Sequence, residues 1–126
     1  MSTTAAITPM QSRVNKQGLS PARRYWQYRH SAERRAIDWQ LTKEQVYVLF
    51  AGNCHYCDTP PNTRYNRAGC VQTFVYNGID RVDNSKGYTI DNVVSCCKHC
   101  NFAKSEMSVD EFKEWIQRVT KRIDLF

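Results

Sequence analysis

The chain has 126 residues, 41% of them hydrophobic, and a formal net charge of +6. This length predicts a single domain that buries about two-thirds of its unfolded surface and would gain from a metal staple. The longest strongly apolar run, residues 46–51, is far short of the roughly 20 residues of a membrane span. We therefore expect a soluble protein that has no membrane partner.

Six cysteines fit either a secreted, disulfide-linked protein or an intracellular, metal-binding one. The first eight residues contain neither the basic nor the apolar region of a secretory signal. We therefore expect a cytoplasmic, intracellular protein whose thiols stay reduced.

The first part of the chain is expected to be basic and then helical. Residues 1–19 are polar without a sustained period, which predicts a flexible basic arm. Ser20 and Pro21 predict the N-cap and first turn of a helix that runs to about Ala36. Residues 20–53 as a whole are expected to form a helical, basic segment.

Basic side chains are concentrated in the first 40 residues, which hold seven of them against two acidic ones. This excess suits contact with a phosphate backbone, although a solvated helix face would give the same pattern. The candidates for phosphate contacts are five arginines of the predicted helix: Arg23, Arg24, Arg29, Arg34 and Arg35.

A capping box from Thr42 to Gln45 predicts a second helix that ends near Gly52. The remaining elements follow in chain order: a loop over residues 60–70, β-structure over 71–76 and 79–82, a strand region over 88–94, a short helix over 97–104, and a final helix that starts at a second capping box, Ser108 to Glu111. The final helix carries an apolar stripe that core packing explains most simply: Phe112, Trp115, Ile116 and Val119.

Four of the cysteines form two Cys-x-x-Cys pairs: Cys54 with Cys57, and Cys97 with Cys100. Four thiolates suit a structural zinc ion, and this spacing lets both sulfurs of a pair reach one ion from a tight turn. We therefore predict a structural Zn²⁺ held by these four residues. Cys70 and Cys96 are expected to be buried apolar thiols, although Cys96 could compete as a ligand.

Hard oxygen ligands lie between and after the cysteine pairs. Asp80 falls in predicted β-structure and Asn101 directly follows the last cysteine, and such side chains suit Mg²⁺ or Mn²⁺. Each residue alone would be interpreted as a surface acid or a helix cap. Asp83 and Asp91 are better interpreted as turn residues.

The order of these motifs resembles that of the HNH, or ββα-metal, endonuclease family. The resemblance covers residues 54–105 and is carried by the first Cys-x-x-Cys, then Gly-Ile-Asp-Arg-Val-Asp-Asn-Ser-Lys-Gly-Tyr, then Asp-Asn-Val-Val, and last Cys-x-x-Cys-Asn-Phe-Ala-Lys. It is similar to the zinc-bearing branch that contains recombination endonuclease VII and phage or homing nucleases. The resemblance implies an α+β fold with a small zinc-stapled ββα-metal core and flanking helices. The core, together with the C-terminal helix, is expected at residues 54–126.

The family resemblance also implies an activity and roles for individual residues. The activity is metal-dependent hydrolysis of phosphodiester bonds in DNA, with double-stranded DNA as partner and a homodimer as a possible assembly. Asp80 and Asn101 would bind the catalytic cation, and Asn92 would brace the loop between the two strands. Lys104 would lie near a substrate phosphate, although a helix lysine that faces solvent is an equally ordinary interpretation.

Arg81 departs from the family pattern, which usually places a water-activating histidine after the metal-binding Asp. Arginine stays protonated and cannot accept that proton. In one interpretation, as in Asp-Arg variants of the family, Arg81 stabilises charge on the phosphate. The nucleophile then comes from a cation-activated water or from a tyrosine, for which the candidates are Tyr65, Tyr76 and Tyr88. In a second, a distant histidine replaces the base: His30, His55 or His99. In a third, cleavage is lost and the fold is a zinc-knuckle module that binds nucleic acid.

Overall fold

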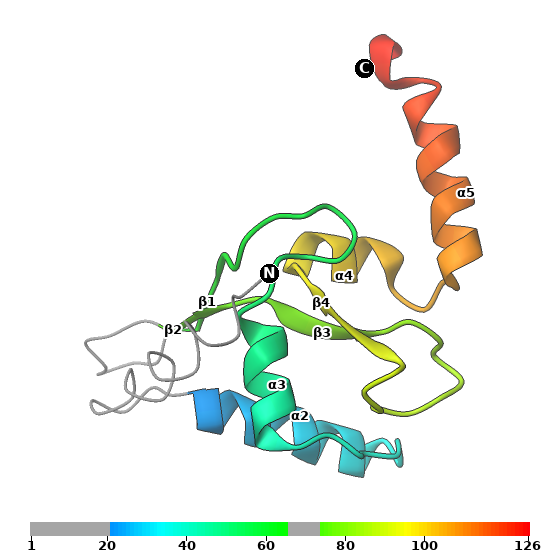
Figure 1. Ribbon diagram of the computed structural model, residues 1–126. Helices are drawn as coiled ribbons and strands as arrows, with labels where there is room; N and C mark the ends of the chain where they lie inside the picture. The colour runs from blue at the N-terminus through cyan, green and yellow to red at the C-terminus, as the bar shows by residue number, and fades with distance from the viewer. Residues whose placement is uncertain (1–20, 66–73) are drawn as a thin grey trace.

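The computed structural model describes residues 21–65 and 74–126 (Figure 1). The predicted flexible arm, the N-cap at Ser20, Cys70 and the first part of the 71–76 strand lie outside the described residues. Within the described part, no helix has the length and apolar character needed to cross a membrane.

Two helices form the lower layer of the molecule in Figure 1: α2 (Pro21–Arg34) and α3 (Lys43–Phe50). Helix α2 ends two residues before the predicted boundary because Ala36 adopts a left-handed φ of 55°. The amide of Ile37 then donates to the carbonyl of Ala32 over 2.8 Å, which is the pairing of a Schellman cap.

The predicted capping box at the start of α3 is confirmed. The amide of Gln45 donates to Thr42 Oγ1 over 3.1 Å, and the Thr42 amide donates to Gln45 Oε1 over 2.9 Å. Val46 and Phe50 of α3 are fully buried in the main hydrophobic core. These two side chains, one helical turn apart, anchor α3 in the core.

The described residues contain four short strands, which form two antiparallel pairs. Strand β1 (Thr63–Tyr65) pairs with β2 (Phe74–Tyr76), and β3 (Gly78–Arg81) pairs with β4 (Val93–Cys96). The first pairing corrects the prediction of a loop over residues 60–70, because Thr and Tyr favour extended backbone and Phe74 and Tyr76 supply a buried partner strand.

The second strand of the β3–β4 hairpin starts later than predicted. A turn in which the Asn92 amide donates to the Thr89 carbonyl over 2.9 Å occupies the beginning of the expected 88–94 strand. Tyr88 instead forms an isolated parallel bridge with Trp39. In the resulting register Asp80 lies opposite Val94.

Helix α4 (Lys98–Lys104) lies against β3 and completes a β–β–α unit (Figure 1). Its N-cap is Cys97, whose sulfur accepts a hydrogen bond from the Cys100 amide over 3.4 Å. The short helix predicted over residues 97–104 is thus present, and a cysteine of the second pair starts it.

Helix α5 (Val109–Thr120) projects away from the rest of the molecule and leads to a 3₁₀ turn, Ile123–Leu125 (Figure 1). Its predicted capping box is present, with the Glu111 amide donating to Ser108 Oγ over 3.1 Å. Within α5 only Phe112 is buried, whereas Trp115 and Ile116 are exposed. The prediction that the whole apolar stripe packs in the core is therefore wrong.

Candidate metal centre and active site

Four cysteine sulfurs converge at the junction of the α3–β1 loop and α4. The ligand atoms of Cys54, Cys57, Cys97 and Cys100 all lie within 4.8 Å of one another. The Sγ atoms of Cys57 and Cys97 are 3.7 Å apart, close to the roughly 3.8 Å that two thiolates span on a tetrahedral zinc ion. The four residues therefore form a cluster that could hold a zinc ion, as their spacing predicted.

Backbone hydrogen bonds fold the first cysteine pair into its turn. Cys54 donates its amide to the Thr59 carbonyl and accepts from the Asp58 amide, each over 2.8 Å. Asp58 takes a left-handed φ of 64°, which closes the turn. The His55 amide donates to the Ser95 carbonyl over 2.8 Å and so attaches this turn to β4.

The thiols of the cluster differ in their electrostatic surroundings. Hydrogen bonds from Thr59 lower the pKa of the exposed Cys57 to about 6. Burial raises the pKa of Cys97 and of Cys100 above the ordinary thiol value. A bound cation would therefore displace protons chiefly from the more buried thiols of the cluster.

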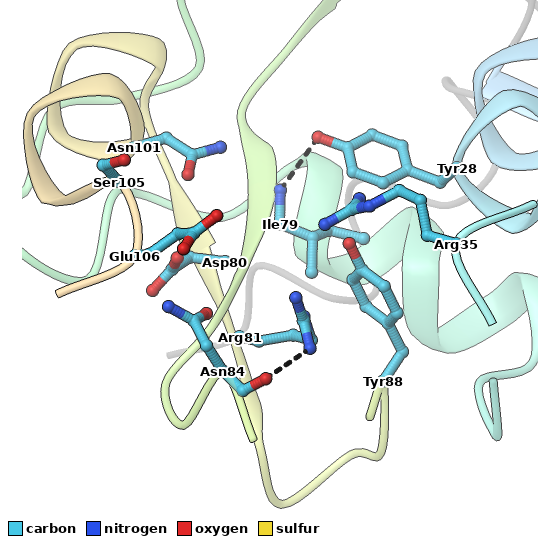
Figure 2. A pocket seen from close by; sticks show the side chains of 10 residues that line it. All are labelled: Tyr28, Arg35, Ile79, Asp80, Arg81, Asn84, Tyr88, Asn101, Ser105 and Glu106. Carbon is cyan, nitrogen blue, oxygen red and sulfur yellow. Dashed lines mark hydrogen bonds between the residues drawn. The ribbon is translucent and has the colours of Figure 1, made fainter. Parts of the chain in front are cut away.

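A polar cavity of about 390 Å³ lies between the β3–β4 hairpin, α4 and the C-terminal end of α2 (Figure 2). Asp80, Asn101 and Glu106 supply oxygen atoms on one side, whereas Arg35 and Arg81 supply guanidinium groups on the other. The cavity thus combines hard oxygen ligands with fixed positive charge.

Asp80 is nearly buried, with 4% of its surface exposed, and two side chains hold its carboxylate. Its Oδ2 accepts from the Tyr56 hydroxyl over 2.8 Å and lies 3.2 Å from the Lys104 ammonium. Lys104 also donates to the Arg81 carbonyl over 3.3 Å.

Lys104 is fully buried, which corrects the expectation of a helix lysine that faces solvent. It also differs from the expectation of a lysine that reaches toward a substrate phosphate, because its ammonium is used inside the protein by Asp80 and by the β3 backbone. The structure therefore places Lys104 behind the cavity, as the counter-charge of Asp80.

Tyr56 is a site residue that sequence reasoning missed, although it occupies the loop of the first cysteine pair. Burial, together with the hydrogen bond to Asp80 and its charge, raises the pKa of the Tyr56 phenol well above its ordinary value. The phenol therefore stays protonated and donates to the carboxylate. The signal available in the sequence was the position of Tyr56 between Cys54 and Cys57. In that loop only the neighbouring His55 was named, as a candidate base.

Arg81 is held by the hairpin loop and lines the cavity. Its Nη1 donates to the carbonyls of Asn84 and Lys86 over 2.9 and 2.8 Å, and its guanidinium carbon lies 5.4 Å from the centre of the Tyr88 ring. Figure 2 shows the contact with the Asn84 carbonyl and the neighbouring Tyr88 ring. The charge of Arg81 is therefore fixed at one wall of the cavity.

Asn92 is buried and braces the loop that holds Arg81. Its Nδ2 donates to the carbonyls of Asp83 and Gly87 over 3.0 and 2.9 Å, and its Oδ1 accepts from the Asp83 amide over 3.0 Å. This is the structural role that the resemblance implied. Gly87 is required in the loop, because a Cβ atom there would lie 2.6 Å from the Asp38 carbonyl oxygen.

The five arginines predicted to contact phosphate are not equivalent. Arg35 lines both the site cavity and a smaller adjoining groove, which Arg24 also lines. Arg24 donates to the Tyr76 hydroxyl over 2.7 Å, and the guanidinium of Arg29 lies over the Trp26 ring. Arg23 and Arg34 are exposed on α2.

The candidate phenols and imidazoles are also distributed unevenly. Tyr88 lines the cavity, Tyr76 belongs to the core, and the side chain of Tyr65 lies outside the described part. Tyr28, which was not among the candidate phenols, also lines the cavity. Its hydroxyl accepts a hydrogen bond from the Ile79 amide over 3.2 Å, and burial raises the pKa of Tyr28 to about 12.

The three histidines are exposed and do not belong to the described cavity lining: His30, His55 and His99.

The turn and thiol predictions are confirmed where the structure describes them. Asp83 Oδ1 accepts from the Ser85 amide and hydroxyl over 2.9 and 2.6 Å, and Asp91 accepts from the Thr89 hydroxyl over 2.6 Å. Cys96 is a fully buried thiol and is not one of the four clustered cysteines.

Comparison with known proteins finds similarity both in sequence and in structure. The uncharacterized protein R423 of Acanthamoeba polyphaga mimivirus is 34% identical over 89 residues, which are 71% of this chain and 15% of the viral protein. The chain thus spans a small part of that relative. No protein-family model matches the sequence.

A structural neighbour is PacI, described as a rare-cutting HNH restriction endonuclease that perturbs DNA. The two structures agree with a TM-score of 0.59 over 88% of this chain and 84% of PacI, at 21% sequence identity. Together with the four-cysteine cluster, this agreement shows that the chain has an α+β, HNH-like fold.

Proposed function

We propose that this chain is a divalent-cation-dependent endonuclease that hydrolyses phosphodiester bonds in DNA. The observation that carries the proposal is that Asp80 and Asn101 face Arg35 and Arg81 across the same cavity (Figure 2). An HNH-like fold, shared with an HNH restriction endonuclease, supports the same assignment. Double-stranded DNA is the proposed substrate, in an intracellular setting where the cysteines remain thiolates.

The oxygen atoms at the cavity fit a catalytic Mg²⁺ or Mn²⁺. A carboxylate from β3 and a side-chain amide from α4 are hard ligands, and the cavity leaves room for the water molecules that Mg²⁺ retains. Asp80 and Asn101 would hold the cation. When bound, it would supply Lewis-acid stabilisation of the charge that develops on the phosphate and the leaving oxygen. Structural Zn²⁺ is the proposed occupant of the four-cysteine cluster.

The guanidinium groups at the opposite wall would bind the scissile phosphate. Arg81 is oriented by two loop carbonyls, and Arg35 reaches the same cavity from the end of α2. Fixed positive charge aimed at a phosphate costs little reorganisation during the reaction, so it stabilises the transition state effectively.

Glu106 is the proposed acceptor of the proton that attacking water must lose. It is an exposed carboxylate that lines the cavity, whereas Arg81 cannot accept a proton and the raised pKa of Tyr28 keeps that phenol protonated near neutral pH. Glu106→Gln should lower kcat by about 100-fold, with little change in DNA affinity. An unchanged kcat would assign the proton to another group.

Plasmid cleavage in Mg²⁺ or Mn²⁺ tests the function itself. Asn101→Ala and Asp80→Asn should each lower cleavage of supercoiled plasmid by at least about 100-fold. The control is Asp91→Asn, in the loop between β3 and β4, which should cleave like wild type. Nicked and linear products distinguish a single-strand cut from the double-strand cut that a homodimer would make. Equal cleavage by all four proteins would overturn the assignment.

A zinc-knuckle module that binds nucleic acid without cutting it is the second candidate. The observations that favour it are Arg81 at the position of the usual base and the engagement of Asp80 by Tyr56 and Lys104. It predicts DNA binding that weakens with salt, is insensitive to Mg²⁺, and is accompanied by no cleavage.

A further inference from the structure

We propose that Tyr56 is a positioning residue that couples the four-cysteine cluster to Asp80. Its backbone lies between Cys54 and Cys57, in the turn that three backbone hydrogen bonds hold to Thr59, Asp58 and β4. Its side chain leaves the cluster and donates to the Asp80 carboxylate over 2.8 Å. One residue therefore joins the proposed zinc site to the proposed catalytic carboxylate; this inference rests on the proposed function.

The hydrogen bond distinguishes the two oxygens of Asp80. Oδ2 accepts from Tyr56 over 2.8 Å and pairs with Lys104 at 3.2 Å, whereas Oδ1 has a longer contact of 3.5 Å with Lys104. Oδ2 is thus the anchored atom and Oδ1 the more available one. Without the phenol, Lys104 alone would hold the carboxylate, which could then rotate about its terminal torsion.

The ring of Tyr56 is held independently of its hydroxyl. It packs edge-to-face against Phe112 of α5, with ring centroids 5.5 Å apart and planes at 86°. Tyr56→Phe therefore keeps this packing and removes the donor alone. Tyr47→Phe is the matched control, because Tyr47 is a half-buried tyrosine on α3 that packs against the main core and is not one of the hydrogen-bond partners described for Asp80.

The experiment measures Mn²⁺ binding by electron paramagnetic resonance in the zinc-loaded chain of 126 residues. Groups that orient metal ligands typically change metal affinity by 10- to 100-fold, so Tyr56→Phe should bind Mn²⁺ about 10-fold more weakly than wild type. Zinc content and the unfolding midpoint should remain close to those of wild type. Tyr47→Phe should bind Mn²⁺ as wild type does.

Cleavage kinetics separate positioning from a general loss of structure. In Tyr56→Phe the Mn²⁺ concentration for half-maximal cleavage should rise about 10-fold, while the KM for DNA stays unchanged. Equal Mn²⁺ affinity in Tyr56→Phe and wild type would overturn the coupling, even if wild type cleaves DNA. Weaker Mn²⁺ binding in the variant, with no cleavage by wild type, would support the coupling and overturn the nuclease. A wild type that binds no Mn²⁺ would overturn both.

Discussion

The ammonium of Lys104 and the carboxylate of Asp80 form an ion pair with almost no solvent exposure. Such a pair repays its desolvation only when its geometry is good and further hydrogen bonds satisfy it. Here Tyr56 and the Arg81 carbonyl complete the set of partners. The pair is consequently sensitive to loss of either member.

Lys104→Met should lower the free energy of unfolding by about 3–5 kcal/mol, because it leaves the Asp80 carboxylate buried beside a neutral side chain. Urea denaturation at fixed zinc concentration measures this change. Combining Lys104→Met with Asp80→Asn should recover a large part of the loss, since the pair is then uncharged. Simple addition of the two single effects would contradict an interaction between these residues.

Tyr28 links α2 to β3 through the hydrogen bond that its hydroxyl accepts from Ile79. Tyr28→Phe should lower the free energy of unfolding at pH 8 by about 1–3 kcal/mol, because the Ile79 amide loses its partner.

The same hydroxyl makes stability depend on pH. Burial raises the folded-state pKa of Tyr28 to about 12, above the ordinary value near 10. The stability that depends on the neutral phenol is therefore complete below pH 10 and is lost as the pH rises toward 12. The difference in stability between wild type and Tyr28→Phe should narrow from pH 8 to pH 11, and a constant difference would count against the raised pKa.

At this scale the sequence predicted residue types better than residue partners. The four thiols follow from the spacing of a repeated motif, whereas the loop contacts of Asn92 were expected only from the family resemblance. The contacts of Tyr56 and Lys104 with Asp80 join residues 24 positions away on either side. Spacing says nothing about such pairs, since they exist only after α4 has packed on β3.

Helices α3 and α5 have the same capping motif but different surroundings. Thr42 caps α3, whose Val46 and Phe50 are fully buried in the core, whereas Ser108 caps α5, of which only Phe112 is buried among the described residues. The same cap should consequently matter in different ways. In α3 it supports global stability, and in α5 it supports local helix formation.

Thr42→Ala should lower the free energy of global unfolding by about 1 kcal/mol, while Ser108→Ala should leave it nearly unchanged. Ser108→Ala should instead increase hydrogen exchange of the α5 amides, because a helix with little tertiary packing opens locally. Exchange measured by mass spectrometry and urea denaturation separate the two results. Equal global destabilisation by both substitutions would show that α5 unfolds together with the core.

The extent of these elements was predictable where local signals were strong. Both capping boxes gave helix starts, but the stripe of α5 gave no information on whether a partner would cover it, so Trp115 and Ile116 were placed in the core wrongly. Strand β1 was missed because its three residues acquire a strand conformation only through pairing with β2. Both errors concern tertiary contacts, which periodicity does not contain.

Two hydrophobic clusters lie in residues 21–65 and 74–126 of the molecule. Helices α2 and α3 and strands β2 and β3 surround the main hydrophobic cluster, whereas the cysteine region forms a smaller cluster of its own. A small cluster of this kind buries little apolar surface, so metal binding would supply much of its stability. Zinc should therefore contribute to folding mainly in the half of the molecule that carries Asn101.

Two adjacent cysteines provide a matched test of this contribution. Cys97→Ser should abolish zinc binding, measured by atomic absorption, and lower the thermal midpoint by at least about 10 °C. Cys96→Ser should retain a full complement of zinc, because Cys96 is a buried thiol outside the cluster. Retention of zinc by Cys97→Ser would indicate that Cys96 substitutes as a ligand.

Cys100 and Asn101 are consecutive residues of α4, and this adjacency limits how the sequence can change in length. A helix turns by about 100° per residue, so one residue inserted between them would rotate Asn101 away from the cavity while the cysteine stayed in place. The same insertion would rotate Lys104 away from Asp80, so it would displace the proposed ligand and break the buried ion pair together. Homologous chains that share the proposed activity should therefore keep the register from cysteine to asparagine without gaps, even where the loops between their strands differ in length.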